Sequence, residues 1–530
     1  MRRGAFARRL TSLCLLPCSL VMLNGAVGAP AERVDAQTPI KYVVIIYQEN
    51  VSFDHYFATY PYAENPPGEP AFKARPGTPD VNGLRGPLLS RNPNAAQPFR
   101  LSRARAATCD QHHDYGREQA AYNQGLVNRV VEASGTGEAA NYGNTKCQPR
   151  DVMGYFDGNT VTALWNYAQH YAMSDNHFAT VFGPSTPGAI NLVSGQTHGA
   201  TGSCDRAEPS SQCVATADEL RTAYGISIVQ RTIIGDAQPQ FDDCATRETA
   251  AMDGRNVGDL LSARGVTWGF FQGGFRRTSK EAEPVQCEAS HVGSDGRERK
   301  DYVPHHQPFQ YYATTSNPKH VAPESVGMIG RNADRANHQY DYQDFLDAAN
   351  AHNLPQVMFL KAPAYQDGHA GYSDPVAEQQ FVVRTINFLQ AKPEWAQMAI
   401  ILTYDDSDGW YDHVMPPIIR GSNTSEDRLT GPGSCGQAAP GAAPGRCGYG
   451  PRLPLLVVSP WARKNYVSHA LTDQVSLLRF IEDNWQLGRL DNGADEDAAG
   501  TLDALFDFSS PPDPTPLVLD EATGQPRPAR

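Results

Sequence analysis

The chain has 530 residues, of which 40% are hydrophobic and 19% charged, and its formal net charge is -13. This length and apolar content suffice for one large domain or two ordinary ones, and the composition is not that of a disordered chain. A chain this acidic is a poor candidate for binding the phosphate backbone of nucleic acid. We therefore expect a globular protein whose partners do not include nucleic acid.

The first 29 residues have the features of a signal peptide. Arginines including Arg8 and Arg9 come before an apolar stretch at 10–23, and small residues follow up to Gly28 and Ala29. The stretch is too short to span a membrane, so we expect cleavage near Gly28 or Ala29. The route of export stays open, because the residues after the arginine pair match a twin-arginine signal poorly. Removal of the segment leaves 41 basic against 58 acidic residues.

Cysteine usage agrees with export. Two of the ten cysteines lie in the signal segment, which leaves an even number: Cys109, Cys147, Cys204, Cys213, Cys244, Cys287, Cys435 and Cys447. An even number in an exported protein favours disulfides. Cys204 with Cys213, and Cys435 with Cys447, are near enough in sequence to close their own loops, although the sequence does not determine the pairing. No pair has the two-residue separation of a zinc knuckle.

Strand-like and helix-like segments alternate along the chain. Apolar runs predict strands at 42–47, 226–234, 266–271, 357–360, 399–404 and 453–458. Helical periodicity follows a capping Asn256 and ends at Gly265, and it recurs at 381–389 and 477–485. Strands that alternate with helices predict an α/β fold, with a mainly parallel sheet covered on both faces. The long polar stretches between them, 62–107, 205–212, 287–302 and 421–450, indicate loops that wall in an active site.

Polar residues immediately follow two of the expected strands. Glu49 and Asn50 come directly after the first strand, and Asp405 and Asp406 directly after the fifth. In open α/β sheets, ligands bind outside the carboxyl ends of the strands. Several acids at one strand end repel each other unless a cation is present, and such oxygens suit Ca²⁺, Mg²⁺ or Mn²⁺, with Zn²⁺ where a histidine joins. Taken alone, the first pair is equally well explained by a strand that exits into a solvated loop.

A hydroxyl lies in a stiff turn within "FGPSTPGAINLVSGQT". Ser185 stands between Pro184 and Thr186, just before an apolar helical stretch at 189–193. A helix amino end offers backbone N–H groups and a favourable potential to an anion. Such a hydroxyl could act as a nucleophile if a base or a metal lowered its pKa. The alternative explanation is an ordinary N-cap.

Histidines occur in three further polar segments. They are the pairs His112–His113 and His305–His306, and the single His369. Imidazoles near a metal-bound ester could stabilise developing negative charge or protonate a leaving group. Each segment alone is also explained by surface decoration.

Five segments, in order, resemble the motifs of the bacterial phosphoesterase family: "QENVSFDHYF", "HHDYGREQ", "FGPSTPGAINLVSGQT", "YQDGHAGYSDP" and "YDDSDGWYDHV". That family contains phosphatidylcholine-hydrolysing phospholipases C and an acid phosphatase, and it is related in fold to alkaline phosphatases and sulfatases. The resemblance implies a three-layer α/β/α sandwich, alkaline phosphatase-like, with long loop insertions over the active-site face. We assign 1–29 to the signal peptide, 30–40 to a linker, 41–490 to the phosphoesterase catalytic domain and 491–530 to a proline-rich tail.

The resemblance also implies the site. One divalent metal, Ca²⁺, Mg²⁺, Mn²⁺ or Zn²⁺, would be bound by Glu49, Asn50, Ser185, Asp405 and Asp406. Ser185 matches the position taken as the nucleophile in the family. The catalytic histidines would be His113, His306 and His369, and the choice of these over His112 and His305 depends on the register of the motifs.

The expected function is that of a secreted or periplasmic bacterial phosphoric ester hydrolase. The Asp405–Asp406 pair stands where many relatives have Asp-Glu-His-Gly-Gly, and an Asp-Asp pair is associated with the acid phosphatase branch. We therefore expect a phosphomonoesterase that forms a phosphoseryl intermediate. The alternative is a phospholipase C acting on phosphatidylcholine-type phosphodiesters, with transient contact with a lipid surface. Choline could then be caged by aromatic rings at Tyr365, Tyr372, Trp410 and Tyr411, which equally suit packing.

Two further classes are less well supported. A sulfatase would need a Cys or Ser in a C/S-x-P-x-R context, and no such motif follows the first expected strand. A non-catalytic secreted binding protein would explain the disulfides but not the joint presence of the acids, Asn50 and Ser185. The sequence does not determine the oligomeric state.

Overall fold

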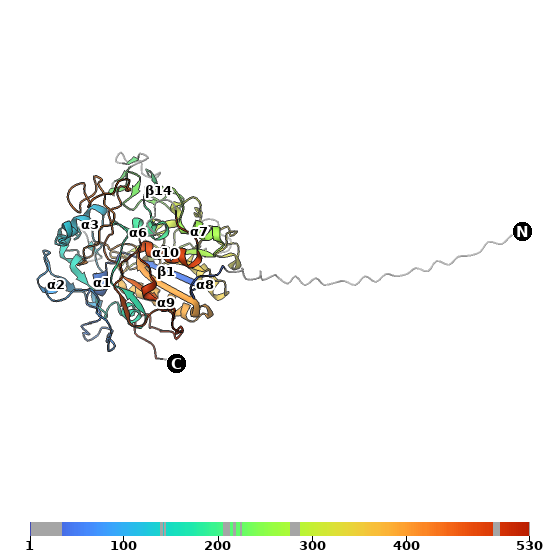
Figure 1. Ribbon diagram of the computed structural model, residues 1–530, viewed down its shortest axis with the longest axis horizontal. Coiled ribbons are helices and arrows are strands. Elements are labelled where there is room, and N and C mark those ends of the chain that lie inside the picture. Colours follow the sequence, from blue (N-terminus) through green and yellow to red (C-terminus); the bar gives the residue numbers. More distant parts are fainter. Residues whose placement is uncertain are drawn as a thin grey trace. The chain divides into compact units, whose positions relative to one another are not determined.

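The computed structural model describes residues 34–137, 141–142, 145–204, 213–215, 219–222, 225–275, 287–490 and 499–528, together with Met1. The stretches from 34 to 528 belong to one compact unit (Figure 1). Apart from Met1, the expected signal peptide lies outside the described residues, as does 491–498. None of the described helices is long and apolar enough to cross a membrane.

The centre of the unit is an eight-stranded sheet in the order β18-β15-β19-β1-β20-β21-β6-β22. Its strands are β18 (Gln339–Asp341), β15 (Trp268–Gln272), β19 (Val357–Lys361), β1 (Tyr42–Gln48), β20 (Met398–Tyr404), β21 (Leu455–Val458), β6 (Ala172–Ser174) and β22 (Tyr466–Ser468). All neighbours pair in parallel except β21, which is antiparallel to both β20 and β6. The expectation of a mainly parallel sheet is confirmed.

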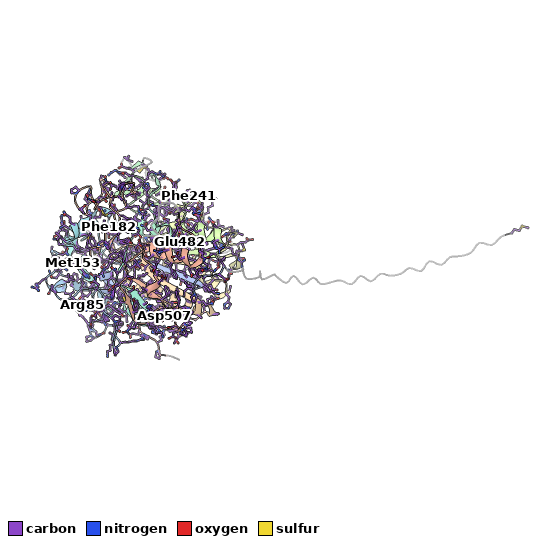
Figure 2. All side chains as sticks on the ribbon, viewed as in Figure 1. Arg85, Met153, Phe182, Phe241, Glu482 and Asp507 are labelled. Atoms are coloured by element: carbon purple, nitrogen blue, oxygen red, sulfur yellow. A yellow bond between two sulfur atoms is a disulfide. The ribbon has the colours of Figure 1, made fainter. Side chains whose placement is uncertain are left out.

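Helices cover both faces of this sheet. Figure 1 shows α6 (Ser185–Ser194), α7 (Val257–Arg264) and α10 (Gln474–Trp485) on one side of β1, and α8 (Tyr342–Asn350) and α9 (Pro375–Gln390) on the other. Helix α6 contacts both α7 and α10, and α5 (Thr162–His170) contacts α9. The arrangement is an α/β/α sandwich. Figure 2 shows Glu482, on the buried side of α10, near the middle of the molecule, and the half-exposed Arg85 toward its margin.

The sequence explains why these elements form. All seven residues of β1 are buried, as expected for a central parallel strand that is covered on both faces. The side chain of Asn256 accepts a hydrogen bond from the N–H of Gly258 (2.9 Å) at the start of α7, and Gly265 ends this helix at φ 78°. At the start of α9, Asp374 accepts from the N–H groups of Val376 and Ala377.

Smaller elements surround the sandwich. The remaining helices are α1 (Phe53–Phe57), α2 (Pro87–Ser90), α3 (Tyr115–Tyr122) and α4 (Val130–Ala133), with 3₁₀ turns at Arg103–Arg105, Asn123–Gly125, Pro149–Met153, Pro304–His306, Pro308–Tyr311, Val326–Met328, Ala364–Gln366, Pro393–Gln397 and Asp503–Leu505. Short strands pair as β2 (Phe99–Arg100) with β5 (Gly154–Tyr155), β3 (Asn141–Tyr142) with β4 (Thr145–Lys146), β7 (His177–Phe178) with β23 (Thr472–Asp473), and β16 (Ser290–Val292) with β17 (Glu298–Lys300). A three-stranded sheet contains β13 (Gln238–Pro239), β14 (Thr249–Met252) and β8 (Ala200–Ser203).

The expectation of a single strand at 226–234 is wrong. The segment forms a hairpin of β11 (Gly225–Val229) and β12 (Thr232–Ile233), which belongs to a separate antiparallel sheet with β9 (Val214–Ala215) and β10 (Leu220–Thr222). Gln230 and Arg231 make the turn with positive φ values of 46° and 63°. Neither residue is a common turn former, so the turn could not be recognised within the apolar run.

Four disulfides join Cys109 to Cys147, Cys204 to Cys213, Cys244 to Cys287 and Cys435 to Cys447. Both short loops expected from the sequence are therefore closed. The described part of the proline-rich tail packs on the sandwich, because the backbone carbonyls of Leu517 and Leu519 accept hydrogen bonds from Gln390 and Asn387 of α9.

Candidate active site

Two adjacent parallel strands deliver four of the expected site residues to one edge of the sheet. Glu49 and Asn50 follow β1, and Asp405 and Asp406 follow its neighbour β20. Asn50 has a positive φ of 56°, a conformation that asparagine tolerates better than most residues. The N–H of Val51 then donates to the carbonyl of Asp406 (2.8 Å), which ties the two strand ends together. Segments about 350 residues apart in the sequence thus form one site.

The hydroxyl of Ser185 lies among these side chains. Its Oγ is 3.0 Å from Asp406 Oδ2, 3.1 Å from Glu49 Oε2 and 3.2 Å from Asn50 Oδ1. Ser185 is the first residue of α6, directly after Pro184, and is buried. One hydroxyl carries one proton and can donate it to one acceptor at a time. Most of these oxygen pairs therefore have no proton between them.

The side-chain amide of Asn50 also lies close to the buried acids. The amide atom that faces the acids lies 2.8 Å from Glu49 Oε2, 3.1 Å from Asp405 Oδ1 and 3.3 Å from Asp406 Oδ2. If this atom is the NH₂ group, it donates to these oxygens. If it is the carbonyl oxygen, oxygens from five side chains converge, Ser185 included, and a cation between them satisfies all five. An all-oxygen set of this kind fits a hard divalent cation.

Crowding affects the protonation of the acids. Burial raises the pKa of Asp405 well above its usual range, and the charge of Glu49 raises it further. Burial and the charge of Asp405 raise the pKa of Asp406 to about 8, although His113 opposes the shift. Burial also raises the pKa of Glu49, with Lys361 opposing it. A divalent cation would stabilise the ionised form of all three acids.

Lys361, which the sequence analysis missed, contacts two of the acids in this cluster. Its Nζ pairs with Glu49 Oε1 and lies 3.6 Å from Asp405 Oδ2, and it is 4.4 Å from the centre of the Tyr47 ring. Burial alone would lower the pKa of this fully buried lysine, but Glu49 and Asp405 raise it overall. The available signal was a charged residue that ends the otherwise apolar strand β19.

His113 faces the site from the segment before α3. Its Nε2 is 3.5 Å from Asn50 Nδ2, and its Nδ1 lies 2.8 Å from the carbonyl of Gln111 and 3.1 Å from Asp408 Oδ1. Burial would lower the pKa of His113, but Asp406 and Asp408 raise it well above the usual range. The raised pKa favours the imidazolium form, in which His113 can serve as a proton donor.

His306 approaches the opposite side of the acids. Its Nε2 lies 3.3 Å from Glu49 Oε2, and burial, with Lys361 next, lowers its pKa well below the usual value. Its neighbour His305 is half-buried, and partial burial lowers the pKa of His305 to about 3. Both rings are neutral at neutral pH. The contact with Glu49 is made by His306, the histidine that the motif register favours.

His369 completes the ring of histidines. Its Nε2 is 3.1 Å from the second terminal atom of the Asn50 amide, and its ring stacks on Tyr372 with centroids 4.3 Å apart. Burial lowers the pKa of His369. The backbone N–H of His112 donates to the carbonyl of Ser134 (2.8 Å), and His112 lines the same pocket as His113. The structure thus brings together all eight side chains expected at the site, while their chemical roles stay predictions.

A pocket of about 880 Å³ lies beside Ser185. Pro184, the residue before Ser185, and His113 form part of its wall, so the pocket adjoins the start of α6 and the expected proton donor. Charged side chains of both signs dominate the rest of the wall: Arg117, Arg129, Arg247, Arg428, Asp110, Asp114, Glu132, Asp236, Glu248 and Glu426. Among the loops expected to wall in the site, 421–450 contributes Glu426 and Arg428.

The four aromatic residues considered for a choline cage have separate partners. Among the described residues, no ring contact joins two of them. Tyr365 stacks on His291 (4.2 Å), Tyr372 on His369 (4.3 Å) and Trp410 on His55 (3.9 Å), and the hydroxyl of Tyr411 accepts a hydrogen bond from Asn92 Nδ2 (2.8 Å). They serve packing rather than one common cage.

A second group of potential metal ligands borders the oxygen cluster. One ligand atom from each of Asp110, His113, His369 and Asp408 lies within 4.8 Å of the others. This group lacks Ser185, whereas the oxygen cluster, formed by Glu49, Asn50, Ser185, Asp405 and Asp406, includes it. The residues present at this edge of the sheet therefore fit a divalent metal, and the oxygen cluster is the set in direct contact with Ser185.

Known proteins are similar in sequence to this chain over most of its length. The chain is 25% identical over 96% of its length to a hemolytic phospholipase C of Pseudomonas aeruginosa and 23% identical over 97% to phospholipase C A of Mycobacterium tuberculosis, covering 61% and 87% of those proteins. It thus spans about three fifths of the length of the first relative. A solved protein of the alkaline phosphatase superfamily from Vibrio parahaemolyticus is similar over 62% of each chain, with 10% identity and a TM-score of 0.25. Residues 40–488 match the Phosphoesterase family over most of the chain, and the protein therefore belongs to that family.

Proposed function

We propose that the protein is a secreted, metal-dependent phosphoric ester hydrolase that works through a phosphoseryl intermediate on Ser185. The observation that carries the proposal is the position of Ser185 Oγ, within 3.2 Å of oxygens from Glu49, Asn50 and Asp406. A structural N-cap would have no need of two buried acids in contact with its hydroxyl. The four disulfides support an oxidising compartment.

The residues suggest the order of events. A divalent ion held by the oxygen cluster would supply positive charge that favours ionisation of the hydroxyl and neutralises a phosphate. Ser185 begins a ten-residue helix, whose N–H groups favour the anionic oxygens of the substrate. Attack by Oγ on phosphorus forms the phosphoserine bond and breaks the ester P–O bond. Water then hydrolyses the phosphoserine and releases phosphate.

The three histidines would have different roles in the reaction. His113 is charged and lines the pocket in which the leaving group would lie, so it is suited to protonate the departing alcohol. His306 and His369 are neutral and can each offer an N–H to the phosphoryl oxygens. Electrostatic stabilisation of this kind is worth about 3 to 4 kcal/mol for one well-placed donor.

A phosphomonoester with a polar alcohol group is the substrate that the pocket favours. Ten charged side chains line the pocket, and the apolar part of its wall comes from Tyr115, Pro184 and scattered alanine and isoleucine residues. Such a wall suits a hydrated group better than two acyl chains. The second candidate is a phospholipid, because the relatives are named phospholipases C.

The test compares purified wild-type protein with Ser185→Ala on a soluble aryl phosphate and on phosphatidylcholine vesicles. We expect rapid aryl phosphate hydrolysis, no turnover by the variant, and a phosphoryl group on Ser185 after acid quenching, detected by mass spectrometry. Ser194→Ala, at the far end of α6, is the matched control and should keep wild-type turnover. Wild-type activity in Ser185→Ala would refute the nucleophile, and faster hydrolysis of phosphatidylcholine would favour the second candidate.

A further inference from the structure

One buried carboxyl group next to the site has no part in the proposed chemistry. Glu118 lies in the first turn of α3 and is 1% exposed. Its Oε2 accepts a hydrogen bond from the backbone N–H of Gly183 (2.9 Å), and its Oε1 accepts a short one from the hydroxyl of Ser407. A buried carboxyl group is costly unless its partners are well placed. Both partners of Glu118 belong to segments that build the site.

The two partners stand immediately beside the proposed nucleophile and a proposed metal ligand. Gly183 is two residues before Ser185, and its φ of 122° lies in the region that favours glycine. Ser407 directly follows Asp406, and its Oγ also accepts from the N–H of Gly409 (3.1 Å). One carboxyl group therefore bridges the turn before α6 and the loop after β20.

The same two segments meet again at the site itself. Ser185 Oγ lies 3.0 Å from Asp406 Oδ2. Among the hydrogen bonds of the described residues, only the side chain of Glu118 bonds to both Gly183 and Ser407. We propose that Glu118 is a positioning residue that sets the distance between Ser185 and Asp406 by holding Gly183 and Ser407. The inference rests on the proposed role of Ser185.

The chemistry of the bridge predicts which substitution preserves it. The bridge needs an acceptor for the N–H of Gly183 and a polar partner for the hydroxyl of Ser407. Glutamine has the same shape, an oxygen for the N–H of Gly183 and an NH₂ for the oxygen of Ser407. Leucine fills similar space but leaves the N–H of Gly183 buried without a partner.

The experiment measures kcat, KM for an aryl phosphate, bound metal and thermal stability in Glu118→Leu and Glu118→Gln. We expect Glu118→Leu to lower kcat at least tenfold, with KM within threefold and metal content unchanged. Glu118→Gln should keep kcat within threefold of wild type. Gln119→Leu is the matched control: it removes buried bonds from the same helix to the N–H groups of Arg428 and Leu429, so it should lower stability without a tenfold loss of kcat.

Three outcomes would overturn the proposal: wild-type kcat in Glu118→Leu, an equal loss in Glu118→Gln, or an equal loss in Gln119→Leu. If Glu118→Leu does not fold, Ser407→Ala tests one arm of the bridge, and we expect a three- to tenfold loss of kcat; no loss would refute the bridge. Ser185→Ala is assayed alongside. An active Ser185→Ala would remove the proposed function, whereas an inactive one beside a fully active Glu118→Leu would remove only the role of Glu118.

Discussion

Lys361 and Ser185 contact different oxygens of the same carboxylate. The Nζ of Lys361 pairs with Glu49 Oε1, whereas Ser185 Oγ lies 3.1 Å from Glu49 Oε2. The lysine is likewise nearest Asp405 Oδ2, and Asp405 Oδ1 accepts from the N–H of Asn50 (3.1 Å). Lys361 thus binds the oxygen of Glu49 that does not contact Ser185 and leaves the other oxygen to face the hydroxyl.

Replacement of Lys361 should destabilise the metal-free protein. Lys361→Met removes one partner of a fully buried ion pair and leaves Glu49 uncompensated, so we expect the free energy of unfolding to fall by about 3–5 kcal/mol. Urea unfolding in the presence of EDTA measures the change. Lys464→Met is the matched control, because its pair with Asp513 is exposed and should change stability by less than about 1 kcal/mol. Equal effects of the two substitutions would contradict this reasoning.

Asp406→Asn should reduce the metal content. The substitution keeps the shape of the side chain but removes a negative charge from a set of hard oxygen ligands. We expect clearly less bound divalent metal than in wild type by elemental analysis after dialysis. Asp80→Asn, on the exposed partner of Arg85, should leave the metal content unchanged. An unchanged stoichiometry in Asp406→Asn would exclude Asp406 from the ligands.

Arg452 should be essential for stability although it has no role in the proposed reaction at Ser185. Its Nε is 3.0 Å from Asp412 Oδ1 and its Nη2 is 3.2 Å from Asp54 Oδ1, so it joins the segment after β20 to helix α1, which follows β1. Arg452→Met should lower the free energy of unfolding by about 3–5 kcal/mol, because it leaves the buried Asp412 without its cation and Asp54 with His413 as its remaining partner. Arg452→Lys should recover only part of this loss, since lysine lacks the planar fork of donors. Full recovery would indicate that charge alone matters.

The pH dependence of stability should respond to Glu378. This buried acid accepts hydrogen bonds from the hydroxyls of Tyr56 (2.9 Å) and Tyr404 (2.6 Å), and burial raises its pKa to about 8 from an ordinary 4.5. Between these two values the folded state keeps a proton that the unfolded state releases, so the free energy of unfolding falls as the pH rises. Glu378→Gln is neutral in both states. Its stability relative to wild type should therefore rise by up to about 1.4 kcal/mol per pH unit across this window, and level off above it.

Urea unfolding at the two ends and the middle of the window measures this difference. Glu324→Gln, at an exposed position, serves as the control and should show a difference that does not vary with pH. A flat difference for Glu378→Gln as well would show that the acid is ionised in the folded protein.

The sequence predicted those parts of the site that depend on strand ends and local turns. Glu49, Asn50, Asp405 and Asp406 were accessible because each pair directly follows a fully apolar run, and Ser185 because prolines and glycine surround it. Lys361 ends a strand in the same way but was overlooked, because a single lysine has no neighbouring acid in the sequence to suggest a pair. Its partners are more than 40 residues away along the chain and become visible only once β19, β1 and β20 lie side by side.

Glu118 and the hairpin at 225–233 could not be predicted from the sequence for a different reason. The role of Glu118 depends on a backbone N–H and a hydroxyl from two distant loops, and side-chain patterns do not encode such contacts. The hairpin turns at Gln230 and Arg231, which have positive φ values that neither residue type favours. Pairing among strands is likewise non-local, which is why the order of the sheet could not be derived from the alternation of segments.

The position of β20 beside β1 has a consequence for the timing of activity during synthesis. Strand β1 is made early, but the neighbour that supplies Asp405 and Asp406 is complete only after residue 406 of 530 has been added. A growing chain that stops short of this point has Glu49, Ser185 and the first histidines but cannot assemble the oxygen cluster. Until that point in synthesis, the chain therefore lacks the two proposed metal ligands that follow β20.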